Sequence, residues 1–533
     1  MTISATARDT TSRNAIALAA VCLSSMMFGL EISSVPAILP TLEKVLHADF
    51  QQLQWIMNAY TIAVTTVLMA TGTLADRYGR KRIYVASILV FGFASLLCGL
   101  AEDALLLILS RTLQGLSGGA MLICQVAVLS HQFRDGPQRA RAFSLWGIIF
   151  GIGLGFGPII GAAIAATLGW PWVFLVHAVL SVVTAALAAA GVRESRDPEA
   201  QSLDLAGIVT LSLAVFCLAY YITQGPDLGF GSPAGLAILG VAILSFAAFL
   251  LAEKFSRRPM FDFSVLRIRA FSGALLGSMG MNFSFWSFMI YLPIYFSSAL
   301  GYDDIQAGLA LLAYTLPTLV VPPFGEKLLL RRGARVAIPA GLFTIGLGFF
   351  TMWIGSNLVT HPSWLTLLPG CLLAGIGLGL TNTTVTNPTT AAVSSTRAGM
   401  ASGIDMSARM ISLALNIAIM GFILIEGIAA ALRAALPATV DPARLQVMAQ
   451  KIAGGSVDAM SFAELGLLAA PGAAVHGALI QGFGFVMLYG GIAVSLLALA
   501  SFLVFGPARA SRRVAGEGVH PADRASATMA DDF

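Results

Sequence analysis

The sequence predicts an all-α protein that crosses a membrane many times. Of its 533 residues, 57% are hydrophobic and only 11% are charged. Soluble globular domains carry roughly 25% charged residues, so this composition excludes that class. The apolar stretches are repeatedly about 20 residues long, which is the length of helix that spans a bilayer. A polytopic helical membrane protein satisfies all three observations.

Fourteen apolar spans follow one another, which places both ends of the chain on one side of the membrane. The expected spans are residues 15–40, 51–74, 82–101, 104–127, 141–166, 171–191, 204–223, 233–252, 271–297, 304–325, 335–355, 363–387, 399–425 and 478–505. The loops on the N-terminal side, both tails included, hold 25 of the 31 Lys and Arg residues, whereas the opposite loops hold four. By the positive-inside rule we expect both termini in the cytoplasm.

Two charged turns at corresponding places indicate an internal repeat. The turn 72–82 follows the second span, and the similar turn 324–335 follows the tenth. We therefore expect two six-helix bundles with two helices inserted between them, and two unrelated basic loops are the alternative. The expected parts are a cytoplasmic tail (1–14), an N-terminal six-helix bundle (15–191), two inserted helices with flanking cytoplasmic loops (192–270), a C-terminal six-helix bundle (271–505) that includes a long extracytoplasmic loop (426–477), and a cytoplasmic tail (506–533). In the long loop, the segment ARLQVMAQKI predicts a hairpin or helix pair over the outer mouth.

Two spans carry a charge well inside the hydrocarbon. At 1.5 Å per residue, Glu31 in span 1 lies roughly 14 Å and Arg111 in span 4 about 12 Å from the outer ends of their helices. A charge at that depth must be neutralised, paired or in contact with a water-filled cavity. The similar depths allow a direct or water-mediated pair, with a purely structural partner for Glu31 as the alternative.

The turn GTLADRYGRKR at 72–82 is the most polar short stretch between two spans. Gly72 lets a neighbouring helix approach closely, and Asp76 can accept hydrogen bonds from helix-start amides. Gly79 permits the reversal of the chain, while Arg80 and Lys81 suit an anionic cytoplasmic leaflet. An ordinary positive-inside loop is the alternative.

Span 5 is a glycine-rich helix with a proline. Gly153, Gly157, Pro158 and Gly161 predict a bend and close packing against a partner helix. A generic glycine-rich membrane helix is the alternative.

Polar and aromatic side chains in several spans are candidates to line a substrate cavity. They are Trp55, Asn58, Gln114, Trp286, Tyr291 and Asn382. Aromatic residues near a membrane interface also form belts, which is the alternative for this set. In span 13, Asp405 and Arg409 lie at i and i+4, and a structural intrahelical pair is the favoured interpretation.

Several kinds of chemistry find no support in the sequence. The five cysteines all fall inside apolar spans, and no CxxC, HExxH or GxxxxGK[ST] motif occurs. The six histidines are scattered over separate segments. We therefore expect no metal, no cofactor, no ATP hydrolysis and no nucleic acid partner, and we expect a protein that is not an enzyme.

Four motifs together resemble the fourteen-helix drug:proton antiporter branch of the major facilitator superfamily, over nearly the whole chain. They are the turn 72–82, LxxxRxxQG at 107–115, GxxxGPxxG at 153–161, and a span 1 pattern similar to LDxTIVNVALP. The resemblance implies that Glu31 and Arg111 take part in proton coupling and that Gly157 and Pro158 belong to an exporter motif. It also implies a cavity lined by spans 1, 4, 9 and 12.

The chain departs from the family pattern at four positions. Glu31 replaces an Asp, Pro36 stands where Asn is usual, and Ala162 replaces a second Gly. Asp405 stands where a neutral amide is common, so with Arg409 it is a second candidate for proton coupling.

The resemblance implies a proton-coupled antiporter of a bacterial inner (plasma) membrane that exports lipophilic drugs or toxic compounds, cations among them. A proton-coupled uptake symporter for a small polar nutrient is the alternative, which the glycine-proline helix and the sparse cavity charge disfavour. A membrane-embedded enzyme or receptor is the third interpretation, and it lacks a clustered constellation. The expected partners are the lipid bilayer, a small lipophilic substrate and protons; a periplasmic adaptor stays open, since no segment points to one.

Overall fold

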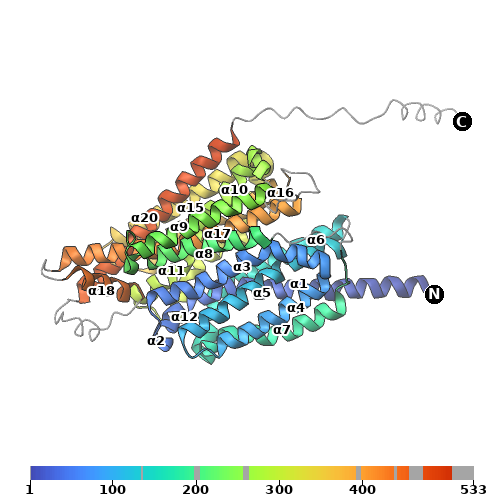
Figure 1. The fold of residues 1–533 in the computed structure, drawn as a ribbon, viewed down its shortest axis with the longest axis horizontal. Coiled ribbons are helices and arrows are strands. Elements are labelled where there is room, and N and C mark those ends of the chain that lie inside the picture. The colour runs from blue at the N-terminus through green and yellow to red at the C-terminus, as the bar shows by residue number, and fades with distance from the viewer. Residues whose placement is uncertain are drawn as a thin grey trace.

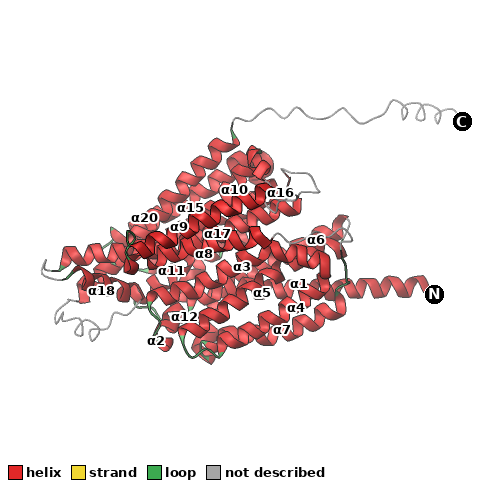
Figure 2. Ribbon diagram, viewed as in Figure 1, coloured by secondary structure: helices red, strands yellow, loops and turns green. Residues whose placement is uncertain are grey.

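The computed structural model describes residues 2–133, 136–196, 205–255, 263–391, 398–436, 441–454 and 472–506. Within these ranges the chain is almost wholly helical and contains no strand (Figure 2). The C-terminal tail beyond 506 and residues 437–440 and 455–471 of the predicted loop 426–477 lie outside the described residues, as do the surroundings of Gly72 and the side chain of Asp76. The predicted all-helical fold is confirmed.

The first seven helices form the N-terminal half of the molecule. They are α1 (Thr2–Ala37), α2 (Leu39–Leu46), α3 (Phe50–Tyr78), α4 (Arg80–Gly99), α5 (Ala104–Gln132), α6 (Gly136–Leu168) and α7 (Pro171–Gly191). Helix α1 packs against α6 and α7, α3 against α5, and α4 against α5 and α7. Pro40, in the first turn of α2, belongs at a helix start because it has no N–H to donate.

Two helices, α8 (Leu205–Leu228) and α9 (Pro233–Phe255), follow and pack against each other. Helix α8 also packs against α3 and α17, so the inserted pair lies beside both halves. The helices of the C-terminal half are α10 (Arg269–Met281), η2 (Asn282–Trp286), α11 (Ser287–Ile294), η3 (Tyr295–Ala299), α12 (Asp304–Thr315), α13 (Pro317–Val320), α14 (Pro322–Arg332), α15 (Ala334–Asn357), α16 (Trp364–Ala391), α17 (Ala398–Ala435), α18 (Pro442–Gly454) and α20 (Gly472–Phe505), after a short 3-10 turn, η1 (Phe263–Arg267).

Eleven helices of the described residues are long and apolar enough to cross a membrane, and a bent pair from Ile305 to Arg332 makes a twelfth. The second predicted span coincides with α3, which has 29 residues. The ninth coincides with the run from α10 to η3, in which one π-helical turn, η2, separates α10 from α11 and a second, η3, ends the run. The polytopic architecture is therefore established, whereas the count of fourteen spans stays a prediction.

The two halves lie side by side, with α2 and α18 at one end of the bundle (Figure 1). The start of α1 and the end of α20 both point away from that end (Figure 1). Helix α18 packs on α17, α3 and α20, and it buries Leu445, Met448 and Ile452. One helix of the predicted long loop therefore lies at the α2 end of the bundle, and the cover over the outer mouth stays a prediction.

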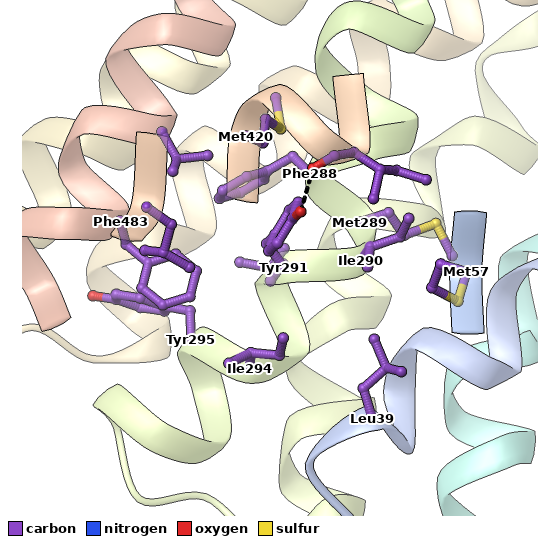
Figure 3. Packing of buried hydrophobic residues seen from close by; sticks show 14 of the residues in the cluster. Leu39, Met57, Phe288, Met289, Ile290, Tyr291, Ile294, Tyr295, Met420 and Phe483 are labelled. Atoms are coloured by element: carbon purple, nitrogen blue, oxygen red, sulfur yellow. Dashed lines mark hydrogen bonds between the residues drawn. The ribbon is translucent and has the colours of Figure 1, made fainter. Parts of the chain in front are cut away.

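Close to the α2–α18 end, Gln54 of α3 in the N-terminal half contacts Tyr291 of α11 and Gly421 of α17 in the C-terminal half. The Tyr291 hydroxyl donates a hydrogen bond to the carbonyl of Ile417, among the buried side chains that Figure 3 shows. The Gln54 amide from α3 donates to the Tyr291 hydroxyl at 3.4 Å. A Cβ at Gly421 would lie 1.5 Å from Gln54 Nε2, so a side chain at this position would displace the Gln54 amide.

We expect Gly421→Val to destabilise this contact between the halves. The added side chain takes the space of the Gln54 amide, and overpacking typically costs about 1–3 kcal/mol. The double variant Gln54→Ala/Gly421→Val should recover most of the loss. Thermal unfolding in detergent measures the effect, with Gly477→Val as the control, because a Cβ at Gly477 meets no atom of the described residues within 4 Å. Equal melting temperatures for the two single variants would contradict the prediction.

Candidate functional site

The centre of the N-terminal half is a buried ion pair between α1 and α5. Glu31 and Arg111 have no exposed surface, and Arg111 Nη1 donates to Glu31 Oε1. The same Nη1 donates to Gln114 Oε1 at 2.7 Å, and Arg111 Nε donates to the carbonyl of Ile56 at 3.1 Å. The guanidinium therefore links α1, α3 and α5 at one point.

Aromatic and polar groups from two further contacts surround this guanidinium. Its carbon lies 4.2 Å from the centre of the Tyr60 ring, a geometry in which the ring face attracts a cation. Gln114 Nε2 donates to Ser95 Oγ of α4 at 2.8 Å, and Cys98 Sγ donates to Gln114 Oε1 at 3.7 Å. These contacts fix the position of Gln114, and through it the position of Arg111.

A histidine that the sequence analysis did not select completes the cluster. His177 of α7 is buried, and its Nδ1 lies 3.4 Å from Glu31 Oε2 and 3.0 Å from the carbonyl of Val173. The available signal was an ionisable side chain in the middle of an apolar span. That signal was set aside because the six histidines share no motif, and their spacing in sequence says nothing about packing between helices.

The energetics of this cluster depend on keeping both charges together. Removing one partner of a buried ion pair typically costs about 3–5 kcal/mol, because the other charge stays in a medium of low dielectric. Arg111 and Glu31 therefore stabilise each other, and the pair holds α1 to α5.

Asp405 and Arg409 form a second polar cluster in the C-terminal half. Arg409 Nη2 lies 2.8 Å and Nε 3.0 Å from Asp405 Oδ2. The Ser278 hydroxyl donates to Asp405 Oδ1, and Arg409 Nη1 donates to Asn382 Oδ1 at 3.4 Å. The cluster joins α10, α16 and α17, so the intrahelical pair also ties neighbouring helices together.

The six candidate cavity residues do not converge on one place. Gln114 belongs to the Arg111 cluster and Asn382 to the Asp405 cluster, while Tyr291 lies at the contact between the halves. Trp55 packs against Phe216 and Tyr220 of α8, with ring centres 5.7 and 5.9 Å apart, and Trp286 packs edge-on against Phe285. Asn58 is fully buried, and neither atom of its amide has a hydrogen-bond partner among the described residues.

The glycines of α6 bring that helix against α1. A Cβ at Gly157 would lie 1.8 Å from Ser33 Oγ, and one at Gly161 would lie 2.6 Å from Ser34 Cβ. On the same side, a Cβ at Gly153 would lie 2.8 Å from the backbone oxygen of Met26. The partner helix that the glycines predicted is therefore α1, the helix that carries Glu31.

Another face of α6 contacts the C-terminal half. Thr315 of α12 donates its hydroxyl hydrogen to the carbonyl of Gly155 at 2.8 Å. Leu319 of α13 lies so close to Gly155 that a Cβ there would be 2.8 Å away. Pro158 lies inside α6, and its carbonyl oxygen would be 3.3 Å from a Cβ at Gly308 of α12. Helix α6 is thus packed between the helix of Glu31 and the other half.

Comparison with known proteins decides the family. The model of the Major Facilitator Superfamily matches residues 21–417 of the chain. The protein belongs to the Major Facilitator Superfamily. The membership that the four motifs predicted is therefore confirmed, and with it a transporter architecture.

Several curated members of the superfamily are similar to this chain over most of their length. Multidrug resistance protein Stp of Mycobacterium tuberculosis is 31% identical over 438 residues, which cover 82% of this chain and 81% of that protein. The tetracenomycin C resistance and export protein of Streptomyces glaucescens is 29% identical, over 95% of this chain and 94% of its own. The drug efflux pump JefA of M. tuberculosis is 30% identical, over 81% and 83% respectively.

The charged turn of this superfamily member is bound to the end of α7. Gly79 has φ +116°, and the amide of Arg80 donates to the carbonyl of Ser195 at 3.0 Å. The amide of Lys81 donates to Glu194 Oε1 at 3.1 Å, and its ammonium donates to the carbonyl of Ala189. The sequence analysis assigned these cations to the lipid surface and missed Glu194, which lies 113 residues further along the chain.

We expect Gly157→Leu to abolish most transport, because a side chain at this position collides with Ser33 and forces α6 away from α1. Gly157→Ala should show a smaller loss, and Ser33→Gly/Gly157→Ala should recover part of it. Gly147→Ala in the same helix is the control, since a Cβ there meets no atom of the described chain within 4 Å. Dye efflux at matched protein content measures the outcome, and normal efflux by Gly157→Leu would mean that this face does not pack against α1.

Proposed function

We propose that the protein is a proton-coupled secondary exporter of lipophilic drugs or toxic compounds, cations among them. The observation that carries the proposal is the fully buried pair of Glu31 and Arg111 inside a membrane-spanning bundle. Ionisable residues within a membrane are rare and mark ion or proton pathways. A carboxylate that can exchange an arginine for a proton is the simplest device that couples proton movement to a change of shape.

The packing around Glu31 supports such coupling. When Glu31 is ionised, Arg111 holds α1 against α3 and α5. When Glu31 carries a proton, the charge that attracts Arg111 is gone and this link weakens. Because α1 packs on α6, and α6 contacts α12 and α13, a shift of α1 is transmitted to the other half. If the proton binds one of two conformations more tightly than the other, proton binding shifts the populations of these conformations.

Two lines support a lipophilic substrate. The similar proteins Stp, JefA and the tetracenomycin C protein carry names of drug resistance, efflux or export. In addition, aromatic rings of the helices pack against one another, as Trp55 of α3 does against Phe216 and Tyr220 of α8 and as Trp286 does against Phe285. In each buried ion pair, Glu31–Arg111 and Asp405–Arg409, the two charges cancel. Neither pair offers an uncompensated charge to a polar substrate, which disfavours the alternative of an uptake symporter for a polar nutrient.

The proposed orientation places both termini in the cytoplasm. It is supported by the excess of Lys and Arg in the loops on the N-terminal side and by the start of α1 and the end of α20, which both point away from the α2–α18 end in Figure 1. The α2–α18 end then faces outward.

Reporter fusions test this orientation. Fusions after Ala200 and after Ala510 should both report a cytoplasmic location, because each follows an even number of spans from the N-terminus. The fusion after Ala200 lies between α7 and α8, so its result does not depend on how many spans follow. The two fusions together therefore test the N-terminal half separately from the rest of the chain. An external signal from either fusion would overturn the proposed topology.

The proton site is tested by exchanging the acid of Glu31. In liposomes with an imposed pH gradient, Glu31→Gln should lose gradient-driven efflux of ethidium, a fluorescent lipophilic cation. It should keep exchange of ethidium in the absence of a gradient, which shows that it folds and binds. Glu31→Asp should retain part of the driven efflux, because the acid survives on a shorter stem.

Asp405→Asn is the matched control for this experiment, since it removes the other deep acid. We expect this variant to keep gradient-driven efflux. Full driven efflux by Glu31→Gln together with its loss in Asp405→Asn would move the proton site to the C-terminal half.

A further inference from the structure

We infer that the imidazole of His177 passes the coupled proton to and from Glu31. The inference rests on the proposed proton-coupled export and adds a residue on α7 to the proton site. It is carried by the position of His177, whose Nδ1 faces the carboxyl of Glu31 while its Nε2 is buried without a partner among the described residues.

The surroundings of Nδ1 determine where the neutral ring carries its hydrogen. Nδ1 lies 3.0 Å from the carbonyl of Val173 and 3.4 Å from Glu31 Oε2. A carbonyl oxygen and an ionised carboxylate only accept hydrogen bonds, so Nδ1 must be the donor. The hydrogen of neutral His177 is therefore on Nδ1, and Nε2 has an open lone pair.

The two oxygens of Glu31 are held differently. Oε1 accepts from Arg111, whereas Oε2 accepts no hydrogen bond from the described residues. Oε2 is thus the oxygen that is free to take a proton. Nδ1 lies on the edge of the imidazole ring that faces Oε2. Nε2, with its open lone pair, lies on the opposite edge of the ring.

These positions define a proton transfer in which one proton enters the ring at Nε2 and one leaves it at Nδ1. A proton binds to Nε2 and makes the ring cationic; the hydrogen on Nδ1 then moves to Glu31 Oε2. His177 is left neutral with its hydrogen on Nε2, Glu31 is left neutral, and one proton has moved from one side of the ring to the other. The carbonyl of Val173 loses the side-chain donor but keeps its place in the helical backbone of α7, so no main-chain bond must break. The reverse sequence returns the proton.

Other groups near the pair are poorer carriers. The titratable side chains around Glu31 and His177 from the neighbouring helices are Arg111 of α5, Tyr60 of α3 and Cys98 of α4. An arginine stays protonated in proteins, the ring of Tyr60 lies under the guanidinium, and the thiol of Cys98 is engaged with Gln114. Imidazole is the side chain whose protonation normally changes near neutral pH.

The test separates proton transfer from positioning. An asparagine at 177 keeps an amide N–H as a hydrogen-bond donor in place of Nδ1–H, but it cannot pass a proton. In liposomes, His177→Asn should therefore keep ethidium exchange without a gradient. It should lose gradient-driven efflux by a factor on the order of a hundred, which is the lower end of what a positioned proton-transfer group contributes. His361→Asn, at an exposed position between α15 and α16, is the matched control and should behave like the unchanged protein.

The outcomes distinguish this inference from the proposed function. If the unchanged protein shows no gradient-driven efflux, or if Glu31→Gln keeps all of it, the proposed proton mechanism fails and this inference fails with it. If Glu31→Gln loses driven efflux while His177→Asn keeps it with an unchanged pH profile, only the relay is overturned. Should His177→Asn not exchange ethidium, His177→Ala is assayed with and without imidazole in the medium. Recovery of driven efflux by imidazole supports the relay, and an unchanged rate overturns it.

Discussion

The ion pair of Glu31 and Arg111 is the interaction on which the N-terminal half depends. Burying two charges in a membrane protein costs several kcal/mol per ion, and only good geometry with further hydrogen bonds offsets that cost. The chain supplies such bonds from Ile56 and Gln114, and the ring of Tyr60 adds a cation–π contact. These contacts hold Nε and Nη1 of the guanidinium, while its Nη2 is buried without a hydrogen-bond partner among the described residues.

A second constraint links this pair to the rest of the molecule. The glycines of α6 bring its backbone against the backbone of α1, and they bring it against the side chains of Leu319 of α13 and Thr315 of α12. Without a hydrophobic driving force between helices in lipid, such close approach is what makes association favourable. Helix α6 is therefore the element through which α1 contacts α12 and α13.

The sequence predicts well what depends on local pattern. Apolar length gives the spans, depth along the helix places Glu31 beside Arg111, and the i, i+4 spacing gives Asp405 with Arg409. It predicts poorly what depends on which helices are neighbours. His177 reaches Glu31 from α7, and Glu194 binds the turn at Gly79, because packing brings distant segments together. The cavity residues were grouped by residue type, and packing distributes them over several contacts.

The two acidic clusters differ in how their carboxylate oxygens are bonded, which bears on where the proposed proton site lies. Both carboxylate oxygens of Asp405 accept hydrogen bonds, one from Ser278 and the other from two nitrogens of Arg409. In Glu31 only one oxygen accepts a hydrogen bond from the described residues, and the other faces an imidazole nitrogen at 3.4 Å. A fully bonded carboxylate loses hydrogen bonds when it takes a proton, whereas one with a free oxygen does not. The C-terminal cluster is therefore suited to hold α10, α16 and α17 together, and the N-terminal cluster is suited to change its charge.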